Sequence, residues 1–384
     1  MMPRKLFMTV ILLGMSLVGV ALSLALSSAG TVGAQGGVIP DFVGSDTCGD
    51  CHVDIARQHQ RHGHSYILNK VDGQQPTYPY SELPSPPEGY TWEDVGLVVG
   101  GFYWRARFLD RDGYVITGRD ENAATQYNFP IADSRTGEVI VAANWEPYRP
   151  GEPQRPYTCA SCHTTGYNYN PTTHMYDLPG LNGMWEEEGV QCEECHGPGS
   201  LHVQDPIRAR LLIDRSKEAC AACHGRGEAG AVQTSDGFIL HHEQYDEIMT
   251  ATHAALDCVD CHDPHRSAVY ADEEVNPRRG LRAQCTDCHF GNTMAPGHAE
   301  NGVTCVDCHM PPMAVSGSRN PELLWADLSA HLYQINTDPA AEQFSEDGGT
   351  LRPYTTVRYA CTRCHADWTV EQMAEAAQGY HDRE

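Results

Sequence analysis

The sequence is poor in positive charge. It contains 26 lysine and arginine residues against 51 aspartate and glutamate residues, which gives a formal net charge of −25 at pH 7. Proteins that bind nucleic acids need a basic surface, so this charge balance excludes that class. The negative field of the whole chain also disfavours a site that gathers small anions, because it repels them. We expect most of the charge to form an ordinary, well-solvated acidic surface.

The sequence also lacks unpaired cysteines. All 16 cysteines belong to Cys-x-x-Cys pairs, and a histidine directly follows every pair. Two thiols one turn apart can bond to the two vinyl groups on one porphyrin edge, and the next residue places an imidazole under the iron as proximal ligand. The eight runs are Cys48/Cys51/His52, Cys159/Cys162/His163, Cys192/Cys195/His196, Cys220/Cys223/His224, Cys258/Cys261/His262, Cys285/Cys288/His289, Cys305/Cys308/His309 and Cys361/Cys364/His365.

This pattern predicts eight covalently attached haem c groups, which we number haem 1 to haem 8 in chain order. A disulfide framework would suit an exported protein, but it gives no reason for the histidines. Structural zinc sites also use Cys-x-x-Cys pairs, and one motif alone would leave zinc a serious alternative. Because all eight motifs end in histidine and no cysteine is left over, we favour haem attachment.

The N-terminus resembles an export signal. Two basic residues precede an apolar run from Leu6 to Leu26, and small residues then lead to a signal-peptidase site after Ala34. The alternative is an uncleaved anchor, since an apolar run of about 21 residues can span a bilayer. The membrane would then be contacted through this segment only. In both cases we expect the haem-bearing part to be periplasmic or extracellular.

The haem motifs are crowded in the second half of the chain. From His163 to His365, seven proximal histidines fall within 203 residues (365 − 163 + 1). Because so few residues cannot wrap each porphyrin separately, neighbouring macrocycles must lie close enough for electrons to pass along a row. The expected fold is a multihaem cytochrome c, with mostly short helices and loops packed around a row of haems and a small β-hairpin insert.

We divide the chain into five segments. They are a signal peptide or anchor (1–34), a first haem segment (35–65), a β insert (66–157), a dense six-haem core (158–310), and a connector with the C-terminal eighth-haem segment (311–384). Residues 311–357 are expected to form an extended connector. A terminal helix is predicted from the capping pair Thr369 and Gln372.

The β insert accounts for the long gap between the first two motifs. A strand is predicted from Val95 to Phe108, followed by a turn at 110–113 and a returning strand from Tyr114 to Thr117. A second hairpin is predicted between Tyr127 and Trp145. We expect the insert to brace the first haem rather than to bind a ligand.

The histidine surplus predicts bis-histidine coordination. Beyond the eight proximal residues, 12 histidines remain: His59, His62, His64, His174, His202, His241, His242, His253, His265, His298, His331 and His381. His265 lies three residues after His262, a reach of about 11 Å at most, so it can bind only a neighbouring haem. The same reasoning applies more weakly to His202, while His253 and His298 could each bind an adjacent haem.

The chain resembles a family of exported multihaem cytochromes c in which a first haem segment precedes a β insert and a dense haem row. The resembling stretches are Cys48–His52, His64–Tyr66, Val99–Phe108, Thr125–Asn128, Cys192–Gly199 with His202, His241–Tyr245, Cys305–Pro311, and His331 with Gln334–Asn336. The resemblance implies electron transfer by bis-histidine haems, and some members of the family stack into extracellular filaments.

The resemblance also implies distal ligands. It suggests His64, His202, His253, His298 and His331 for this role. It does not decide between His241 and His242, of which we assign His242. To this set we add His265 and His381, and the latter would serve the last haem or a neighbouring subunit. His59 or His62 could also act across a subunit boundary, and His174 has no clear counterpart.

We predict that the protein conducts electrons to an extracytoplasmic acceptor. We expect redox partner proteins to exchange these electrons with it, and we expect a homopolymer if the subunits stack. Bis-histidine coordination throughout would make every haem low-spin. The alternative is an octahaem oxidoreductase that acts on a small nitrogen or sulfur compound, which needs one iron with an open position. All eight motifs end in histidine, so the sequence favours the conduit.

Overall fold

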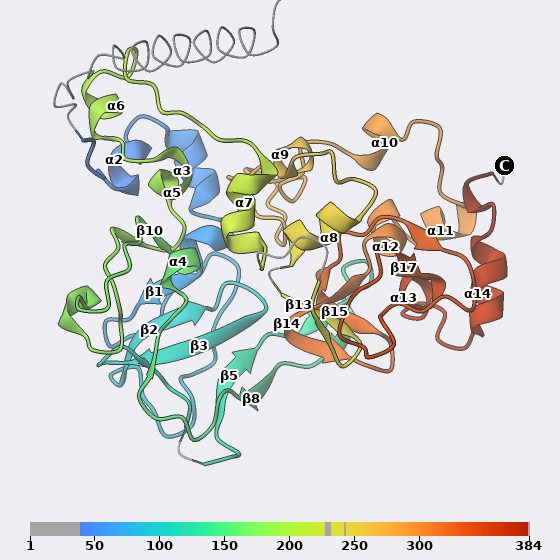
Figure 1. The fold of residues 1–384 in the computed structure, drawn as a ribbon, viewed down its shortest axis with the longest axis horizontal. Helices are drawn as coiled ribbons and strands as arrows, with labels where there is room; N and C mark the ends of the chain where they lie inside the picture. The colour runs from blue at the N-terminus through green and yellow to red at the C-terminus, as the bar shows by residue number, and fades with distance from the viewer. Residues whose placement is uncertain (1–38, 119, 227–231, 242, 383–384) are drawn as a thin grey trace, which may run out of the picture. The chain divides into compact units, whose positions relative to one another are not determined.

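The structure is a computed structural model that describes residues 39–118, 120–226, 232–241 and 243–382. The chain from Phe42 onward forms one compact unit (Figure 1). The predicted signal segment 1–34 lies outside the described residues. Within the described ranges, no helix has the length and apolar character needed to cross a membrane.

Short helices carry the haem motifs. They are α2 (Ser45–Gly49), α4 (Ala160–His163), α5 (Cys192–His196), α7 (Lys217–His224), α9 (Cys258–Cys261), α10 (Cys285–Cys288), α12 (Cys305–His309) and α13 (Val357–Cys361). Three of them begin with a capping box, in which Asp257, Gln284 or Thr304 exchanges hydrogen bonds with the aspartate three residues later. In these three motifs, one capped turn is enough to bring both thiols and the histidine to the same side of the short helix.

Five further helices connect the motifs. They are α3 (Val53–His59), α6 (Ser200–Gln204), α8 (Gln244–Thr250), α11 (Pro296–Glu300) and α14 (Val370–Ala377), with the 3₁₀ turns η1 (Gly63–Tyr66), η2 (Met175–Asp177) and η3 (Tyr380–Asp382). The predicted terminal helix is confirmed as α14, and Thr369 and Gln372 form its capping box.

The insert contains the largest sheet. Its strands are β1 (Leu68–Lys70), β2 (Val95–Gly100), β3 (Arg105–Asp110), β4 (Tyr114–Val115), β5 (Ala124–Asn128), β8 (Asn144–Pro147) and β9 (Arg155–Pro156). They follow the order β1-β2-β3-β4-β9, and β5 pairs with both β3 and β8. A small hairpin of β6 (Ile131–Ala132) and β7 (Val139–Val141) lies inside the β5–β8 connection, as the predicted second hairpin requires.

The single strand predicted from Val95 to Phe108 is wrong. The chain turns back after Gly100, and β2 and β3 pair antiparallel. Gly100 and Gly101 both have positive φ, and Trp104 does too, which is the backbone conformation that a tight reversal needs. The predicted turn at 110–113 and the short returning strand are confirmed, since Leu109 pairs with Val115.

A second sheet replaces the predicted extended connector. It consists of β12 (Thr234–Ser235), β13 (Phe238–Leu240), β14 (Pro312–Asn320) and β15 (Trp325–Ser329). β14 is nine residues long and buries Met313 and Ala314 fully. Two-residue pairs complete the sheets: β10 (Thr164–Thr165) with β11 (Glu187–Glu188), and β16 (Ile335–Asn336) with β17 (Thr355–Thr356).

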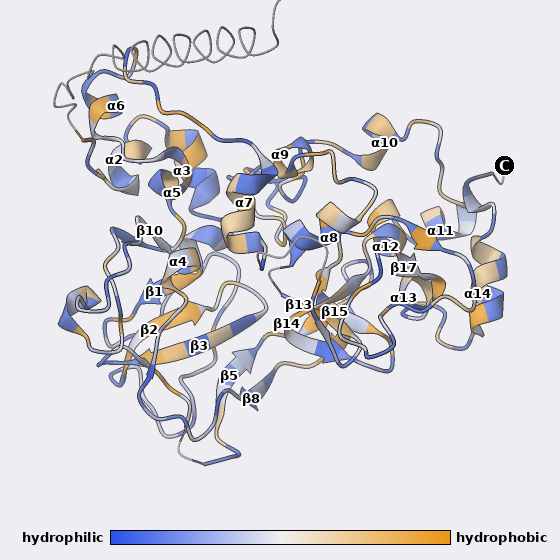
Figure 2. Cartoon of the chain, in the orientation of Figure 1, coloured by the Kyte–Doolittle hydropathy of each residue, from blue (hydrophilic) through white to orange (hydrophobic). Residues whose placement is uncertain are grey.

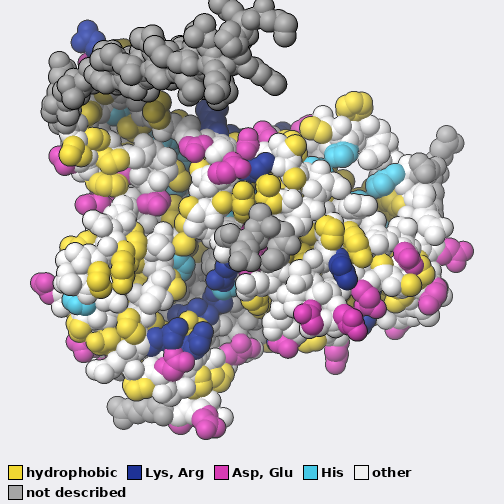
Figure 3. All heavy atoms as spheres, viewed as in Figure 1, with side chains coloured by type: hydrophobic (Ala, Val, Ile, Leu, Met, Phe, Trp, Pro, Cys, Tyr) yellow, Lys and Arg dark blue, Asp and Glu magenta, His cyan; other side chains and the backbone are white. Residues whose placement is uncertain are grey.

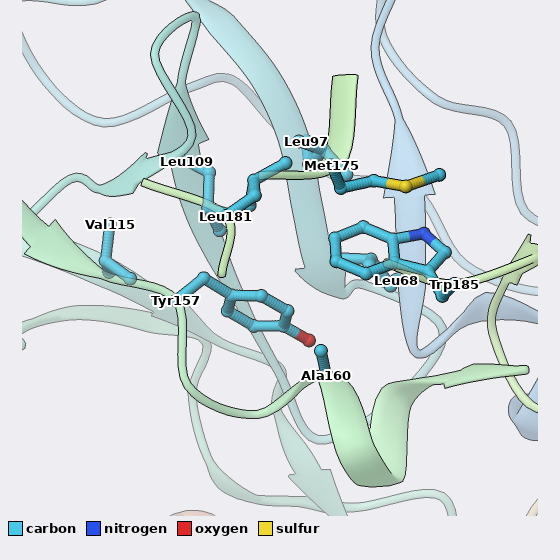
Figure 4. Close-up of a cluster of buried hydrophobic side chains, with 9 residues drawn as sticks. All are labelled: Leu68, Leu97, Leu109, Val115, Tyr157, Ala160, Met175, Leu181 and Trp185. Atoms are coloured by element: carbon cyan, nitrogen blue, oxygen red, sulfur yellow. The ribbon is translucent and has the colours of Figure 1, made fainter. Parts of the chain in front are cut away.

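The cores are small and local, because much of the chain serves the haem motifs. Figure 2 shows the most apolar ribbon on β2, β3 and the sheet around β14. One cluster lies directly against the second haem motif, where Ala160 of α4 packs with Tyr157, Leu181 and Trp185 (Figure 4). The predicted combination of short helices, loops and a small β insert is confirmed.

Candidate haem centres and an arginine-lined site

Seven proximal histidines face a second histidine. Two imidazoles that ligate one metal ion have ring centroids about 6 Å apart, because each metal–nitrogen bond is about 2 Å and each ring centre lies about 1 Å further. The pairs and centroid distances are His52–His202 (6.3 Å), His64–His224 (6.1 Å), His196–His265 (6.2 Å), His253–His289 (5.9 Å), His262–His331 (6.4 Å), His298–His365 (6.0 Å) and His309–His381 (5.8 Å). These residues fit a bis-histidine haem iron.

Hydrogen bonds at the outer ring nitrogen orient several of these imidazoles. His202 Nδ1 lies 3.1 Å from the carbonyl oxygen of Ala209, and His309 Nδ1 lies 2.6 Å from that of Tyr333. A carbonyl oxygen only accepts, so each Nδ1 donates and the lone pair of Nε2 is left for a metal. These two hydrogen bonds therefore support the ligand assignment that the ring distances suggest.

The structure places the other predicted ligands as follows. His381 was expected at haem 8 or in a neighbouring subunit, but its ring lies against His309 of haem 7. His242 lies outside the described residues. His59 is buried and His62 is half-buried beside it, with ring centroids 6.1 Å apart, and a role of either across a subunit boundary stays a prediction. His241 Nε2 lies 2.5 Å from Arg105 Nη2, which can only donate, so that nitrogen is already engaged.

Contacts between thiols order the motifs in space. Four pairs of thiols lie near enough for one to shift the pKa of the other: Cys48 with Cys192, Cys162 with Cys223, Cys220 with Cys258, and Cys285 with Cys305. Electrostatic contacts join Cys195 to Cys220, Cys261 to Cys288 and Cys308 to Cys364. Since each thiol marks a porphyrin edge, the motifs follow the order 1, 3, 4, 5, 6, 7, 8, and motif 2 lies beside motif 4.

The two attachment cysteines of motif 1 differ in exposure. Cys48 lies on α2 and is half-buried, whereas Cys51 follows the end of α2 at Gly49 and is exposed. A 3.3 Å hydrogen bond from the Cys51 amide to the Cys48 carbonyl oxygen keeps the two residues together. The role of Cys51 in holding haem 1 stays a prediction from the motif.

The second motif differs from the other seven in its histidine. Among the described residues, no imidazole packs against His163, and its Nδ1 is buried without a hydrogen-bond partner. Burial and the nearby positive charges of Arg105 and Arg107 lower the pKa of His163 to about 4. The Tyr157 ring centroid lies 6.3 Å from that of His163, and its buried hydroxyl also lacks a partner.

Both arginines come from one face of the insert. Arg105 and Arg107 alternate along β3 with Ala106 and Phe108, whose side chains are fully buried on the opposite face. Arg105 pairs with Asn128 across to β5, so the polar side chains of both strands share the face toward the second motif. Both guanidinium groups lie within electrostatic range of the Cys159 sulfur, which places them near the haem attachment point.

This face concentrates positive charge in an acidic protein. Figure 3 shows Lys and Arg side chains gathered in one hollow of the visible face, over the region of β3 and β5. Burial first, and repulsion from Arg107 second, lower the pKa of Arg105 to about 9. This face is therefore locally basic, although the chain as a whole is acidic. The alternating arginines of β3 were the sequence signal for it.

The comparisons with known proteins agree with these observations. Residues 135–197 match the family described as cytochrome c554 and c-prime. The chain is 21% identical to the dissimilatory sulfite reductase MccA of Wolinella succinogenes over 88% of its own length and 63% of that protein. It is 26% identical to the multiheme cytochrome MtrA of Shewanella baltica over 42% of its length and 47% of that protein.

The fold is similar as well. The solved octaheme sulfite reductase MccA of Wolinella succinogenes superposes with a TM-score of 0.58 at 17% identity, covering 85% of this chain and 66% of that one. The chain thus spans less than two thirds of this relative. Its motifs, fold and relatives make it a multihaem c-type cytochrome, and haem c is its cofactor.

The number of haems is open to a direct test. All eight attachment motifs are intact, and seven have a histidine pair of suitable geometry. We expect the intact mass of the mature protein to exceed the mass of its polypeptide by eight haems. A mass with six haems or fewer in fully matured protein would contradict the octahaem prediction.

Proposed function

We propose that this cytochrome is an oxidoreductase that acts on a small oxyanion of sulfur or nitrogen at haem 2, while the other seven haems carry electrons. The proposal depends on one contrast. Seven proximal histidines face another histidine, whereas His163 faces none among the described residues and lies beside Arg105 and Arg107.

The two arginines suit such a substrate. A guanidinium presents planar N–H donors that match two oxygens of an oxyanion, and it keeps its charge in a partly buried site. A haem iron held by His163 would supply a ligand site and one-electron chemistry. The protein's own part is to attract the anion against the repulsion of an acidic surface and to fix its orientation.

The relatives support this choice of substrate class without deciding it. The name of one relative describes a sulfite reductase, and that of another describes a multiheme cytochrome. Sulfite is therefore the first compound to test and nitrite the second. Electrons would reach haem 2 through the row of haems that the sequence predicts, since motif 2 lies beside motif 4 of that row. The predicted redox partners, homopolymer and export remain proposals.

Spectroscopy of the oxidised protein tests the proposal. We expect one high-spin haem per chain by electron paramagnetic resonance, instead of the wholly low-spin protein that the sequence favoured. Adding sulfite or nitrite should change the spectrum of that haem alone and saturate at one equivalent per chain.

The competing outcome involves His242, which the sequence assigns as a distal ligand. If His242 ligates haem 2, the parent protein will be wholly low-spin and neither anion will perturb it. The variant His242→Ala will then gain one high-spin haem. That pair of results would overturn the enzyme proposal and restore the simple conduit.

A further inference from the structure

We propose that Gln126 and Tyr148 are positioning residues that hold the Arg107 guanidinium ready for the oxyanion, whereas Arg105 is engaged by the protein itself. The inference rests on the function proposed above. It assigns different roles to two arginines that alternate on the same strand and look equivalent in the sequence.

Arg107 is held at two places that leave its outer end free. Its Nε donates a 2.7 Å hydrogen bond to Oε1 of Gln126, and its guanidinium carbon lies 3.6 Å from the centroid of the Tyr148 ring. The ring fixes the plane of the guanidinium, and the Nε bond fixes its rotation within that plane. Among the described residues, neither terminal nitrogen of Arg107 has a hydrogen-bond acceptor.

Gln126 is itself fixed. It is buried on β5, and its Nε2 donates a 2.7 Å hydrogen bond to Oδ1 of Asn128, which is fully buried. With the amide nitrogen committed to Asn128, the amide oxygen must face Arg107. β14 closes this arrangement from the other side, because a Cβ at Gly317 would lie 3.1 Å from Oδ1 of Asn128. Two hydrogen bonds thus connect Asn128 to Gln126 and Gln126 to Arg107.

Arg105 has the opposite arrangement. Its Nη1 donates to the carbonyl oxygen of Ser316 on β14, and its Nη2 to Nε2 of His241. Both terminal nitrogens are therefore occupied, and the side chain ties together three distant parts of the chain. Arg105 contributes positive charge near His163, but it has less donor capacity left for a ligand.

Pre-positioning of Arg107 has a thermodynamic consequence. A free arginine loses rotamer entropy when it binds an anion, and a guanidinium already held in place loses less. Removing either support should weaken binding while leaving the charge of the site unchanged. An effect on affinity without an effect on charge is what separates a positioning residue from a merely charged one.

Three variants of the holoprotein test this inference: Gln126→Leu, Tyr148→Leu and the conservative Tyr148→Phe. The measurement is the dissociation constant of sulfite, from the absorbance change of the oxidised protein at equilibrium, together with haem content and the thermal midpoint. We expect Gln126→Leu and Tyr148→Leu each to raise the dissociation constant about 5- to 10-fold. Tyr148→Phe keeps the ring and should stay within about twofold of the parent.

The outcomes separate the two proposals. If the parent binds sulfite and both leucine variants bind it equally well, the positioning inference is wrong and the proposed function stands. If neither sulfite nor nitrite perturbs any haem of the parent, the proposed function fails and the inference fails with it. If Gln126→Leu does not fold, the contrast between Tyr148→Leu and Tyr148→Phe decides the question alone.

Discussion

Replacing Arg107 by glutamine is expected to raise the dissociation constant of sulfite at haem 2 about 100-fold. A hydrogen-bonded contact between a guanidinium and an oxyanion in a partly buried site contributes about 3 kcal/mol, which corresponds to that factor. Glutamine retains much of the length of the side chain and removes the charge and the fork of donors. Anion titration of the oxidised protein measures the effect, and the midpoint of thermal unfolding shows whether the fold survives.

The matched control is Arg149→Gln, which removes one positive charge close to Arg107. The Arg149 side chain is 56% exposed and pairs with Glu152 at 3.8 Å. Solvent screens such a group, so this variant should change the dissociation constant less than about twofold. Equal effects of the two substitutions would mean that the site attracts anions through its general field, with no specific role for Arg107.

Replacing His381 by alanine is expected to add one high-spin haem per chain, at haem 7. The His381 ring lies 5.8 Å from that of His309, with an interplanar angle of 19°. The preceding residue helps to hold it, because the Tyr380 hydroxyl lies 2.7 Å from Nδ1 of His298. The loss of one imidazole leaves the iron of haem 7 with a single protein ligand, which electron paramagnetic resonance detects.

This experiment is made on the monomeric fraction, so that no neighbouring subunit can supply the ligand. His174→Ala serves as its control, since no motif histidine packs against His174 within the described ranges. An unchanged spin state in His381→Ala would contradict the assignment. A parent monomer that loses a high-spin signal only on association would instead support the cross-subunit ligand considered from the sequence.

Several parts of the molecule could be predicted because their causes are local. A Cys-x-x-Cys-His run holds both thiols and the ligand within five residues, so its chemistry is readable without the fold. The short reach from His262 to His265 likewise required a neighbouring haem, and the structure places His265 against His196. The terminal helix was predictable for the same reason, because its capping box spans four residues.

The predictions that failed concern pairing between distant segments. Branched and aromatic residues continue through the reversal between Val95 and Phe108, so composition alone did not show where the strand ends. β14 pairs with β13 as well as with β15, although more than 70 residues separate β13 from β14 (312 − 240 = 72). The segment 311–357 is rich in proline, glycine and serine and was therefore predicted to be irregular. Its β-structure depends on strand pairing that the local sequence pattern does not show.

By itself, the sequence determined the class of protein: the covalent haem motifs, the surplus of histidine ligands and the acidic charge are all properties of residues and short spacings. Only the tertiary structure decided which histidines meet, that His163 meets none among the described residues, and that an acidic chain carries a cationic hollow. The physical reason lies in distance along the chain. Arg105 contacts residues 136 and 211 positions away, and contacts of that kind depend on how sheets and loops pack rather than on any local pattern.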